Sequence, residues 1–257
     1  LPYIFSSLLL PFQDSINLVP IFENNIIINS FFESVSGITT TGASVFTNFP
    51  SLEHHSMLIF WRSLTQWLGG IGIILLVLII FPRISVGIMQ IASDQEGTGP
   101  QKERITPRLY QTGITLLIIY AVITLILFLL LFFIGNLNSF DSIVHSFSTV
   151  SSGGFSSYPL SIETLNNFSV EMIILCFMFL SGISFAIFYF VITGNFQKIL
   201  ENSEFKTFVL FNILLVLSLV LILQNQYNFE TALDSFRYGS FQALSISTGT
   251  GFTTYNF

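Results

Sequence analysis

Cysteine and charged residues are both scarce in this sequence. Its 257 residues include one cysteine, Cys176, in the middle of an apolar run, and only 9% are Asp, Glu, Lys or Arg. A single cysteine excludes an intrachain disulfide and a cysteine-rich metal site. A water-soluble domain normally carries about 25% charged residues. With 52% apolar residues and a mean hydropathy of +0.76, the chain is predicted to be an all-α polytopic membrane protein.

Four apolar segments are long enough to cross a hydrocarbon core of about 30 Å as helices. They are residues 56–81, 109–134, 170–193 and 205–223. A weaker apolar stretch at 1–12 has the character of the tail of an earlier span. No charged region followed by an apolar core and a cleavage site is seen, so no signal peptide is expected, and both ends look like cuts through a longer protein.

Lys and Arg gather in the connections between the first and second spans and between the third and fourth spans. Basic residues favour the cytoplasmic side, so we expect these two connections there. The remaining connections are mainly acidic and are therefore expected on the outer side, where they would attract cations. Ordinary topology bias with a solvated acidic face is the alternative explanation. The net charge of −6 says little about partners, because the charges are sorted by side of the membrane.

Three polar stretches share one pattern, and each lies between apolar segments. They read VSGITTTGAS, FSTVSSGGFS and LSISTGTGFT, and an alignment without gaps brings Gly42, Gly154 and Gly251 together. A short helical pattern precedes each stretch, at residues 25–35, 140–147 and 231–244, too short to cross a membrane. The repeat predicts re-entrant loops that line an ion path. Three unrelated polar loops between helices are the alternative.

Such loops suit a permeating cation. Backbone carbonyls can replace the hydration shell of the ion without a fixed full charge, and glycine reaches the necessary backbone angles at little steric cost. Ser and Thr hydroxyls add further ligands, and the preceding short helices aim their negative ends inward. We therefore predict potassium-binding filter residues at Thr40, Thr41, Gly42, Ser152, Gly153, Gly154, Gly249, Thr250 and Gly251. The neighbouring Gly153 leaves the register of the second loop open by one residue.

Arg62 begins the first full span, where an unpaired charge would be costly. We predict that it pairs with Glu33 or another acid and supports the first loop; a snorkelling interfacial arginine is the alternative. Gln66 is a further candidate for bracing this region, with packing as its default role. His145 aligns with Glu33 and is expected to be structural.

The repeating unit is helix, short helix, loop, helix. It predicts a first repeat at 1–82 with most of its leading helix missing, a cytoplasmic linker at 83–108, a second repeat at 109–193, a cytoplasmic loop at 194–204 and a third repeat at 205–257 without its trailing helix.

At these residues the chain resembles the Trk/Ktr/HKT superfamily of potassium transporters, in particular its bacterial TrkH/TrkG branch. The similar segments are SFFESVSGITTTGAS, FWRSLTQWLGGIGIILLVLIIFP, STVSSGGFS and STGTGFTT. The resemblance implies four pore-loop repeats around a central ion pathway, three of them present here. It also implies a glycine in each filter segment, and Gly42 stands where a serine in the family goes with sodium preference. A homodimer in the bacterial inner membrane, lipid contacts and a TrkA-like nucleotide-binding regulatory subunit are further implications, with no nucleic acid partner.

Potassium uptake is accordingly the expected function, and no enzyme activity or bound cofactor is expected. A sodium-permeable or non-selective relative is the first alternative. A non-conducting membrane scaffold is a second, and an intramembrane hydrolase using Ser152 is a third. The hydrolase needs a base on a neighbouring helix, and no histidine lies within a full predicted span.

Overall fold

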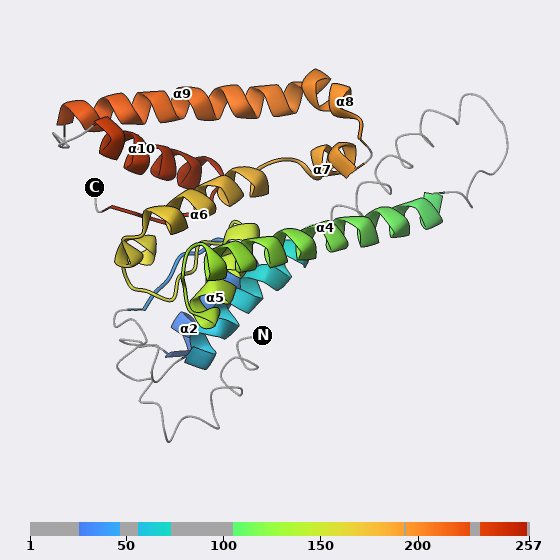
Figure 1. Cartoon of the computed structure of the whole chain (residues 1–257). Helices are drawn as coiled ribbons and strands as arrows, with labels where there is room; N and C mark the ends of the chain where they lie inside the picture. The colour runs from blue at the N-terminus through green and yellow to red at the C-terminus, as the bar shows by residue number, and fades with distance from the viewer. Residues whose placement is uncertain (1–25, 47–55, 73–104, 193, 227–231, 256–257) are drawn as a thin grey trace, which may run out of the picture.

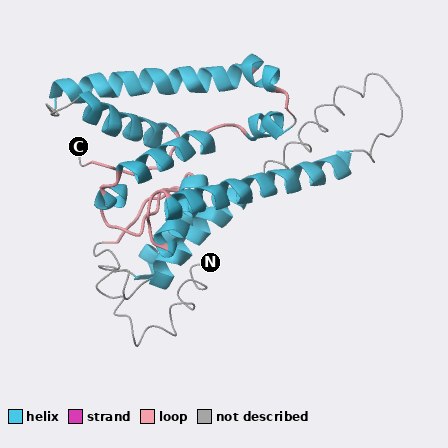
Figure 2. Cartoon of the chain, in the orientation of Figure 1, coloured by secondary structure: helices cyan, strands magenta, loops and turns pink. Residues whose placement is uncertain are grey.

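The computed structural model describes residues 26–46, 56–72, 105–192, 194–226 and 232–255. Every regular element within these ranges is a helix, which confirms the predicted all-α fold (Figure 2). The apolar stretch at 1–12, residues 73–81 of the first predicted span and residues 83–104 of the predicted linker lie outside the described residues.

The two longest described helices, α4 (Ile105–Phe133) and α9 (Ser203–Gln226), are separated by a series of shorter ones (Figure 1). In chain order, the described helices are α2 (Ile26–Ile38), a helix at 56–72, α4, α5 (Ser139–Val150), the 3-10 helix η2 (Ser161–Leu165), α6 (Phe168–Ser181), α7 (Phe185–Ile192), α8 (Phe196–Glu201), α9 and α10 (Ala232–Ser247). The short helices α2, α5 and α10 are those predicted to precede the polar loops. Helix α5 packs on α4, and α10 packs on both α9 and α6.

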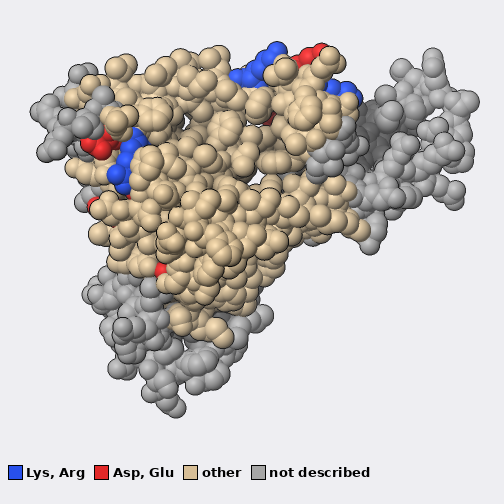
Figure 3. Space-filling view, in the orientation of Figure 1, with Lys and Arg blue, Asp and Glu red and all other residues tan. Residues whose placement is uncertain are grey.

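Two described helices are long and apolar enough to cross a membrane. Residues Gly113–Phe133 of α4 have a mean hydropathy of 3.2, and Ser203–Gln224 of α9 have 2.5. Only 33% and 11% of the respective windows are buried, so most of their apolar side chains face outward. The face shown in Figure 3 carries almost no charged side chains over α4 and α6. Outward apolar surface of this extent fits a lipid environment.

The third predicted span is wrong as a single helix. Residues 170–193 form two helices, because α6 ends at Ser181 and α7 begins at Phe185. Gly182 caps α6, and a Cβ there would lie 2.8 Å from Phe208 and 3.0 Å from Thr248. The close approach of α9 and of the third loop therefore requires a residue without a side chain, and glycine weakens a helix interior.

Two predicted connections also need correction. The loop predicted at 194–204 contains the helix α8 at Phe196–Glu201. Residues 105–108 were predicted to belong to the linker, but they form the first turn of α4. A prediction from the length of an apolar segment locates the core of a membrane span, but it leaves out the polar helical turns at the ends of the helix.

The short helix α5 is unusual because it is polar and yet mostly buried. Its buried side chains include several serines, a threonine, Asp141 and His145. The hydroxyls of Ser142, Ser146 and Thr149 each donate to the carbonyl oxygen four residues earlier, at 2.8, 2.6 and 2.6 Å. These local bonds satisfy the hydroxyls, so that a polar helix can sit in the interior and carry the second loop to the centre of the protein.

Candidate functional site

The three polar loops leave the C-terminal ends of α2, α5 and α10 in the same way. Amide groups at the start of each loop fold back onto the last helical turn: Thr41 N–H donates to Ser36 O at 2.9 Å, Gly153 N–H to Ser148 O at 2.8 Å and, one aligned position later, Gly251 N–H to Ser245 O at 3.2 Å. Ser36, Ser148 and Ser245 are the aligned serines of the repeat. These loop N–H groups are thus hydrogen-bonded to the helix ends, and the loop carbonyl groups remain available to other partners.

Backbone conformation repeats among the loops with the same spacing. The left-handed pairs are Thr40 and Gly42 with φ of 56° and 76°, Ser152 and Gly154 with 54° and 74°, and Gly249 and Gly251 with 75° and 78°. This pattern places Gly154, rather than Gly153, in register with the other two glycines. A left-handed angle disfavours residues with a Cβ, yet Thr40 and Ser152 adopt it at the first position, whereas the second position is glycine in all three loops.

The loops lie against one another in chain order. A Cβ on Gly42 would lie 1.9 Å from the carbonyl oxygen of Gly153, and a Cβ on Gly154 would lie 1.7 Å from that of Thr250. Each glycine therefore receives the backbone of the following loop where no side chain would fit. The Cβ position of Gly251 has no described atom within 4 Å, so this series of contacts stops at the third loop within the described residues.

The chemistry of the site is that of neutral oxygen atoms. Thr39 and Thr41 share a hydroxyl–hydroxyl bond of 2.8 Å, and Thr248 and Thr250 share the equivalent bond, also 2.8 Å. The aligned loops contain no carboxylate. Across the described ranges, no group of three or more His, Cys, Asp or Glu side chains could hold a metal ion. Carbonyl and hydroxyl oxygens are suited to a weakly held, mobile cation.

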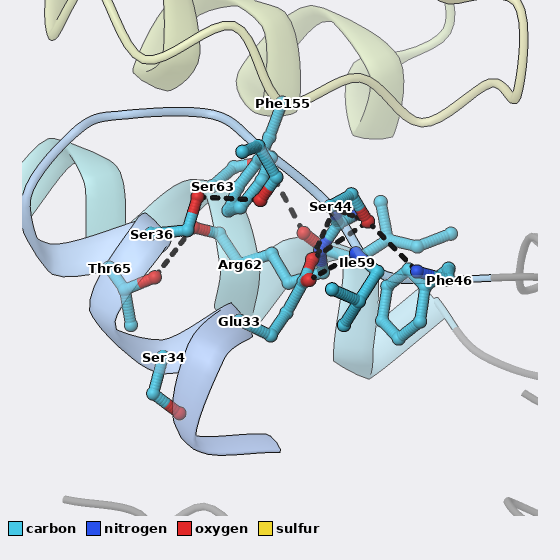
Figure 4. A network of polar contacts seen from close by, with 12 residues as sticks. Glu33, Ser34, Ser36, Ser44, Phe46, Ile59, Arg62, Ser63, Thr65 and Phe155 are labelled. Atoms are coloured by element: carbon cyan, nitrogen blue, oxygen red, sulfur yellow. Dashed lines mark hydrogen bonds and ion pairs between the residues drawn. The ribbon is translucent and has the colours of Figure 1, made fainter. Parts of the chain in front are cut away.

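Glu33 and Arg62 meet between α2 and the helix at 56–72, with side chains pointing toward one another (Figure 4). Their closest nitrogen–oxygen distance is 2.6 Å, and both side chains are almost fully buried. Glu33 also accepts from the Ser44 hydroxyl at 3.1 Å and from the Val45 amide at 3.2 Å. The Arg62 guanidinium stacks on the ring of Phe155 at 4.0 Å. The pair thus joins the end of the first loop to the second loop.

His145 occupies the position of Glu33 in the second repeat. Its Nε2 lies 3.1 Å from the Ser156 hydroxyl, and its ring contacts Phe252 of the third loop with centroids 6.0 Å apart. Ser156 aligns with Ser44, and Phe252 aligns with Phe155. In each repeat, one contact therefore reaches the loop of that repeat and another reaches the following loop. An ion pair makes these contacts in the first repeat, and a histidine makes them in the second.

Asp141 anchors the outer end of the second loop. It is 1% exposed and accepts from the Ser157 hydroxyl at 2.5 Å, the Tyr158 hydroxyl at 2.6 Å and the Asn138 amide at 2.8 Å. Burial, and then the bond to Asp141, raise the pKa of Tyr158, so its hydroxyl remains a donor. Asn138 caps α5 by accepting from the Asp141 amide at 2.7 Å, while its own side-chain amide donates to the Asp141 carboxylate.

Sequence reasoning missed one contact, that of Arg237, and left the bracing role of Gln66 open. Arg237 of α10 makes a two-pronged ion pair with Glu171 of α6, with both nitrogen–oxygen distances at 2.6 Å. Gln66 bonds to the backbone of the second loop, although packing was its default role. For Arg237 the available signal was that it is one of only two basic residues, with Arg62, in segments expected on the outer side.

Ser152 does not have the surroundings that a hydrolase needs. Its hydroxyl donates to that of Ser181 at 3.0 Å. The nearest candidate base in the sequence, His145, is directed to the Asp141 carbonyl at 2.8 Å and to Ser156. A serine that donates to another serine has no general base to activate it.

Comparison with known proteins identifies the family to which this architecture belongs. The TrkH family, described as "Cation transport protein", matches residues 21–257. The chain is 36% identical over 256 residues to the Trk system potassium uptake protein TrkH of Salmonella typhimurium, covering 99% of this chain and 49% of that protein. It is 33% identical over 234 residues to the Escherichia coli K12 protein TrkG, covering 90% of this chain and 47% of that one.

A solved structure gives the same result. The crystal structure of the potassium transporter TrkH from Vibrio parahaemolyticus superimposes with a TM-score of 0.76 at 30% identity. The match covers 93% of this chain and 47% of that chain. The chain thus spans about half the length of the relatives it matches.

Proposed function

The chain belongs to the TrkH family of cation transport proteins, and on that premise we propose that the full-length protein takes up potassium across the membrane. Its relatives carry the name potassium uptake protein, and transport rather than catalysis fits the neutral oxygen atoms of the site. The family resemblance noted in the sequence is confirmed, and so is the membrane character of the protein.

The observation that carries the proposal is the repetition of one loop geometry at three adjoining positions. The matching left-handed angles at Gly42, Gly154 and Gly251 go with loop amides that are turned back to the helix ends. Within the described residues, no protein hydrogen bond reaches the carbonyl oxygens of these three glycines. We infer that the carbonyls, with the hydroxyls of Thr41 and Thr250, replace the water around a potassium ion.

The full filter in this proposal comprises Thr40, Thr41, Gly42, Ser152, Gly153, Gly154, Gly249, Thr250 and Gly251. Glu33 and Arg62 support its first loop. A fourth loop from the remainder of the full-length protein would lie beside Gly251, whose Cβ position is open. The repeat boundaries follow the helices, with α2 and the 56–72 helix in the first, α4 to α7 in the second, and α9 and α10 in the third.

The wider assembly is part of the same proposal. The positive-inside bias supports a cytoplasmic position for the connection that holds α8 and Lys198, and an outer position for the loops. We infer an inner-membrane homodimer in contact with lipid and with a TrkA-like cytoplasmic regulatory subunit.

The test is rubidium uptake by potassium-transport-deficient cells that express the full-length protein together with its regulatory partner. We expect uptake that excess potassium blocks and excess sodium blocks little. Equal competition by sodium would replace the proposal with a sodium-permeable or non-selective transporter. Absence of uptake with both proteins present in the membrane would favour the non-conducting scaffold.

A further inference from the structure

Gln66 reaches from the helix of the first repeat to the loop of the second. The side chain is fully buried, its Nε2 donates to the carbonyl oxygen of Gly153 at 2.6 Å, and its Oε1 accepts from the amide of Phe155 at 3.2 Å. These two backbone groups flank Gly154, which has a φ of 74°. One side-chain amide therefore holds the second loop on both sides of its left-handed glycine.

The same side chain explains why the second loop departs from the threonine pattern. Gly153 stands where the first loop has Thr41 and the third has Thr250. A Cβ on Gly153 would lie 2.3 Å from Cδ of Gln66 and 2.5 Å from its Oε1. The amide of Gln66 occupies the space that a threonine side chain would need, so the loop sequence and the helix residue are matched to each other.

The second loop also lacks a hydrogen bond that the first and third loops have. Ser36 donates to the carbonyl of Ala43 and Ser245 to that of Phe252, both at 2.6 Å. The equivalent hydroxyl in the second repeat, on Ser148, is buried and has no hydrogen-bond partner among the described residues. The residue after the aligned glycine is thus held through its carbonyl by the short helix in the first and third loops, whereas in the second loop it is held through its amide by Gln66 of the neighbouring repeat.

We propose that Gln66 is a selectivity-determining positioning residue that acts through the Gly153 carbonyl. That carbonyl packs against Gly42, so the bond from Gln66 sets the position of the second loop relative to the first. Loss of the bond frees the carbonyl to turn toward a smaller ion. This proposal rests on the proposed transport of potassium and names a residue that tunes it.

The experiment compares Gln66→Leu and Gln66→Glu in the full-length protein, by rubidium uptake in competition with potassium and sodium. Leucine keeps the approximate volume without either bond, and glutamate keeps the shape but, as the ionised carboxylate at high pH, has no proton to donate to the carbonyl. We expect potassium-over-sodium discrimination to fall about tenfold in both, equivalent to about 1.4 kcal/mol. The ratio is the readout, because a purely structural role would lower the amount of protein and the total flux without changing it.

Two further variants sharpen the test. Met178 follows Gly154 by the same 24 residues that separate Gln66 from Gly42, and it is fully buried. Met178→Leu is therefore the matched control and should keep the wild-type ratio. Gln66→Ala combined with Gly153→Thr restores the threonine pattern of the other loops, and it should recover part of the discrimination that Gln66→Ala alone loses.

The outcomes distinguish a failure of the proposed potassium transport from a failure of the proposed role of Gln66. A wild type that does not prefer potassium overturns the proposed function. A selective wild type whose Gln66→Leu and Gln66→Glu variants keep the same ratio overturns only the role of Gln66. If Gln66→Leu does not accumulate, the isosteric Gln66→Glu decides; absence of both from the membrane would assign Gln66 to folding alone and reject the proposal.

Discussion

Gly154→Ala places one methyl group at the junction of the second and third loops. Its Cβ would lie 1.7 Å from the carbonyl oxygen of Thr250 and 2.9 Å from the carbonyl carbon. Real Cβ contacts essentially never fall below 3.0 Å, so the loops must separate by about 1.3 Å, the difference between 3.0 and 1.7 Å. The obstacle is backbone rather than the end of a flexible side chain, and relief therefore moves the backbone of the loops that we propose to bind the ion.

Two costs add in this variant. A left-handed angle costs a residue with a Cβ about 1–2 kcal/mol, and overpacking an interior costs about 1–3 kcal/mol. The sum, about 2–5 kcal/mol, can appear as lost stability or as displaced ion ligands. A tenfold change in an equilibrium corresponds to about 1.4 kcal/mol, so we expect potassium-over-sodium discrimination to fall by a factor of ten or more.

Gly249→Ser is the matched control for this prediction. Gly249 is also left-handed, with a φ of 75°, but its Cβ position has no described atom within 4 Å. The second loop already carries Ser152 at the aligned position with a φ of 54°. Rubidium competition and thermal unfolding in detergent should both show a much smaller effect than Gly154→Ala. Equal effects of the two variants, or none from Gly154→Ala, would refute the packing argument.

Three other substitutions test the surroundings of the loops. Gly42→Ser puts a Cβ 1.9 Å from the Gly153 carbonyl and should lower potassium-over-sodium discrimination; an unchanged ratio in uptake competition would reject the assigned register. Arg62→Gln leaves the buried Glu33 carboxylate without its arginine and should cost about 3–5 kcal/mol in thermal unfolding, most of it recovered when Glu33→Gln is added. A double variant no more stable than Arg62→Gln would argue against the pair. Asp141→Asn turns one acceptor of the Ser157 and Tyr158 hydroxyls into a donor, and unfolding should reveal a loss of about 1–3 kcal/mol; unaltered stability would contradict this anchoring role.

The short helices before the loops were predictable because two independent signals coincide at each. An apolar pattern too short to cross a membrane runs directly into a Ser-, Thr- and Gly-rich segment. The observed bounds, Ile26–Ile38, Ser139–Val150 and Ala232–Ser247, extend the predicted ranges mainly at the C-terminal end. The difference arises because the last helical turn already contains the Ser, Thr and Gly residues of the repeat, which are typical of loops.

The break between α6 and α7 was not predictable from hydropathy. Gly182 lies in the short segment 181–184 between two apolar runs, and so brief an interruption by small residues is compatible with a continuous helix. The helix breaks because Phe208 and Thr248 approach Gly182 closely, and these residues follow Gly182 by 26 and 66 residues. Tertiary contacts of that range leave no local trace in the sequence.

The pairing of Gln66 with the second loop was likewise hidden by distance, since 87 residues separate Gln66 from Gly153. The repeat alignment did contain a sign of it, because Gly153 interrupts a position where the other loops carry threonine. A missing side chain in one copy of a repeat indicates that another residue fills its space. The sequence alone does not identify that residue, but it marks the position at which to look.

Rubidium influx into liposomes containing the purified full-length protein and the proposed regulatory subunit tests the central claim most directly. External potassium and sodium are compared as competitors over the same concentration range, with Gly154→Ala as the parallel sample. The account predicts strong inhibition by potassium, weak inhibition by sodium, and loss of this difference in Gly154→Ala. Equal inhibition of the wild type by both ions would contradict it.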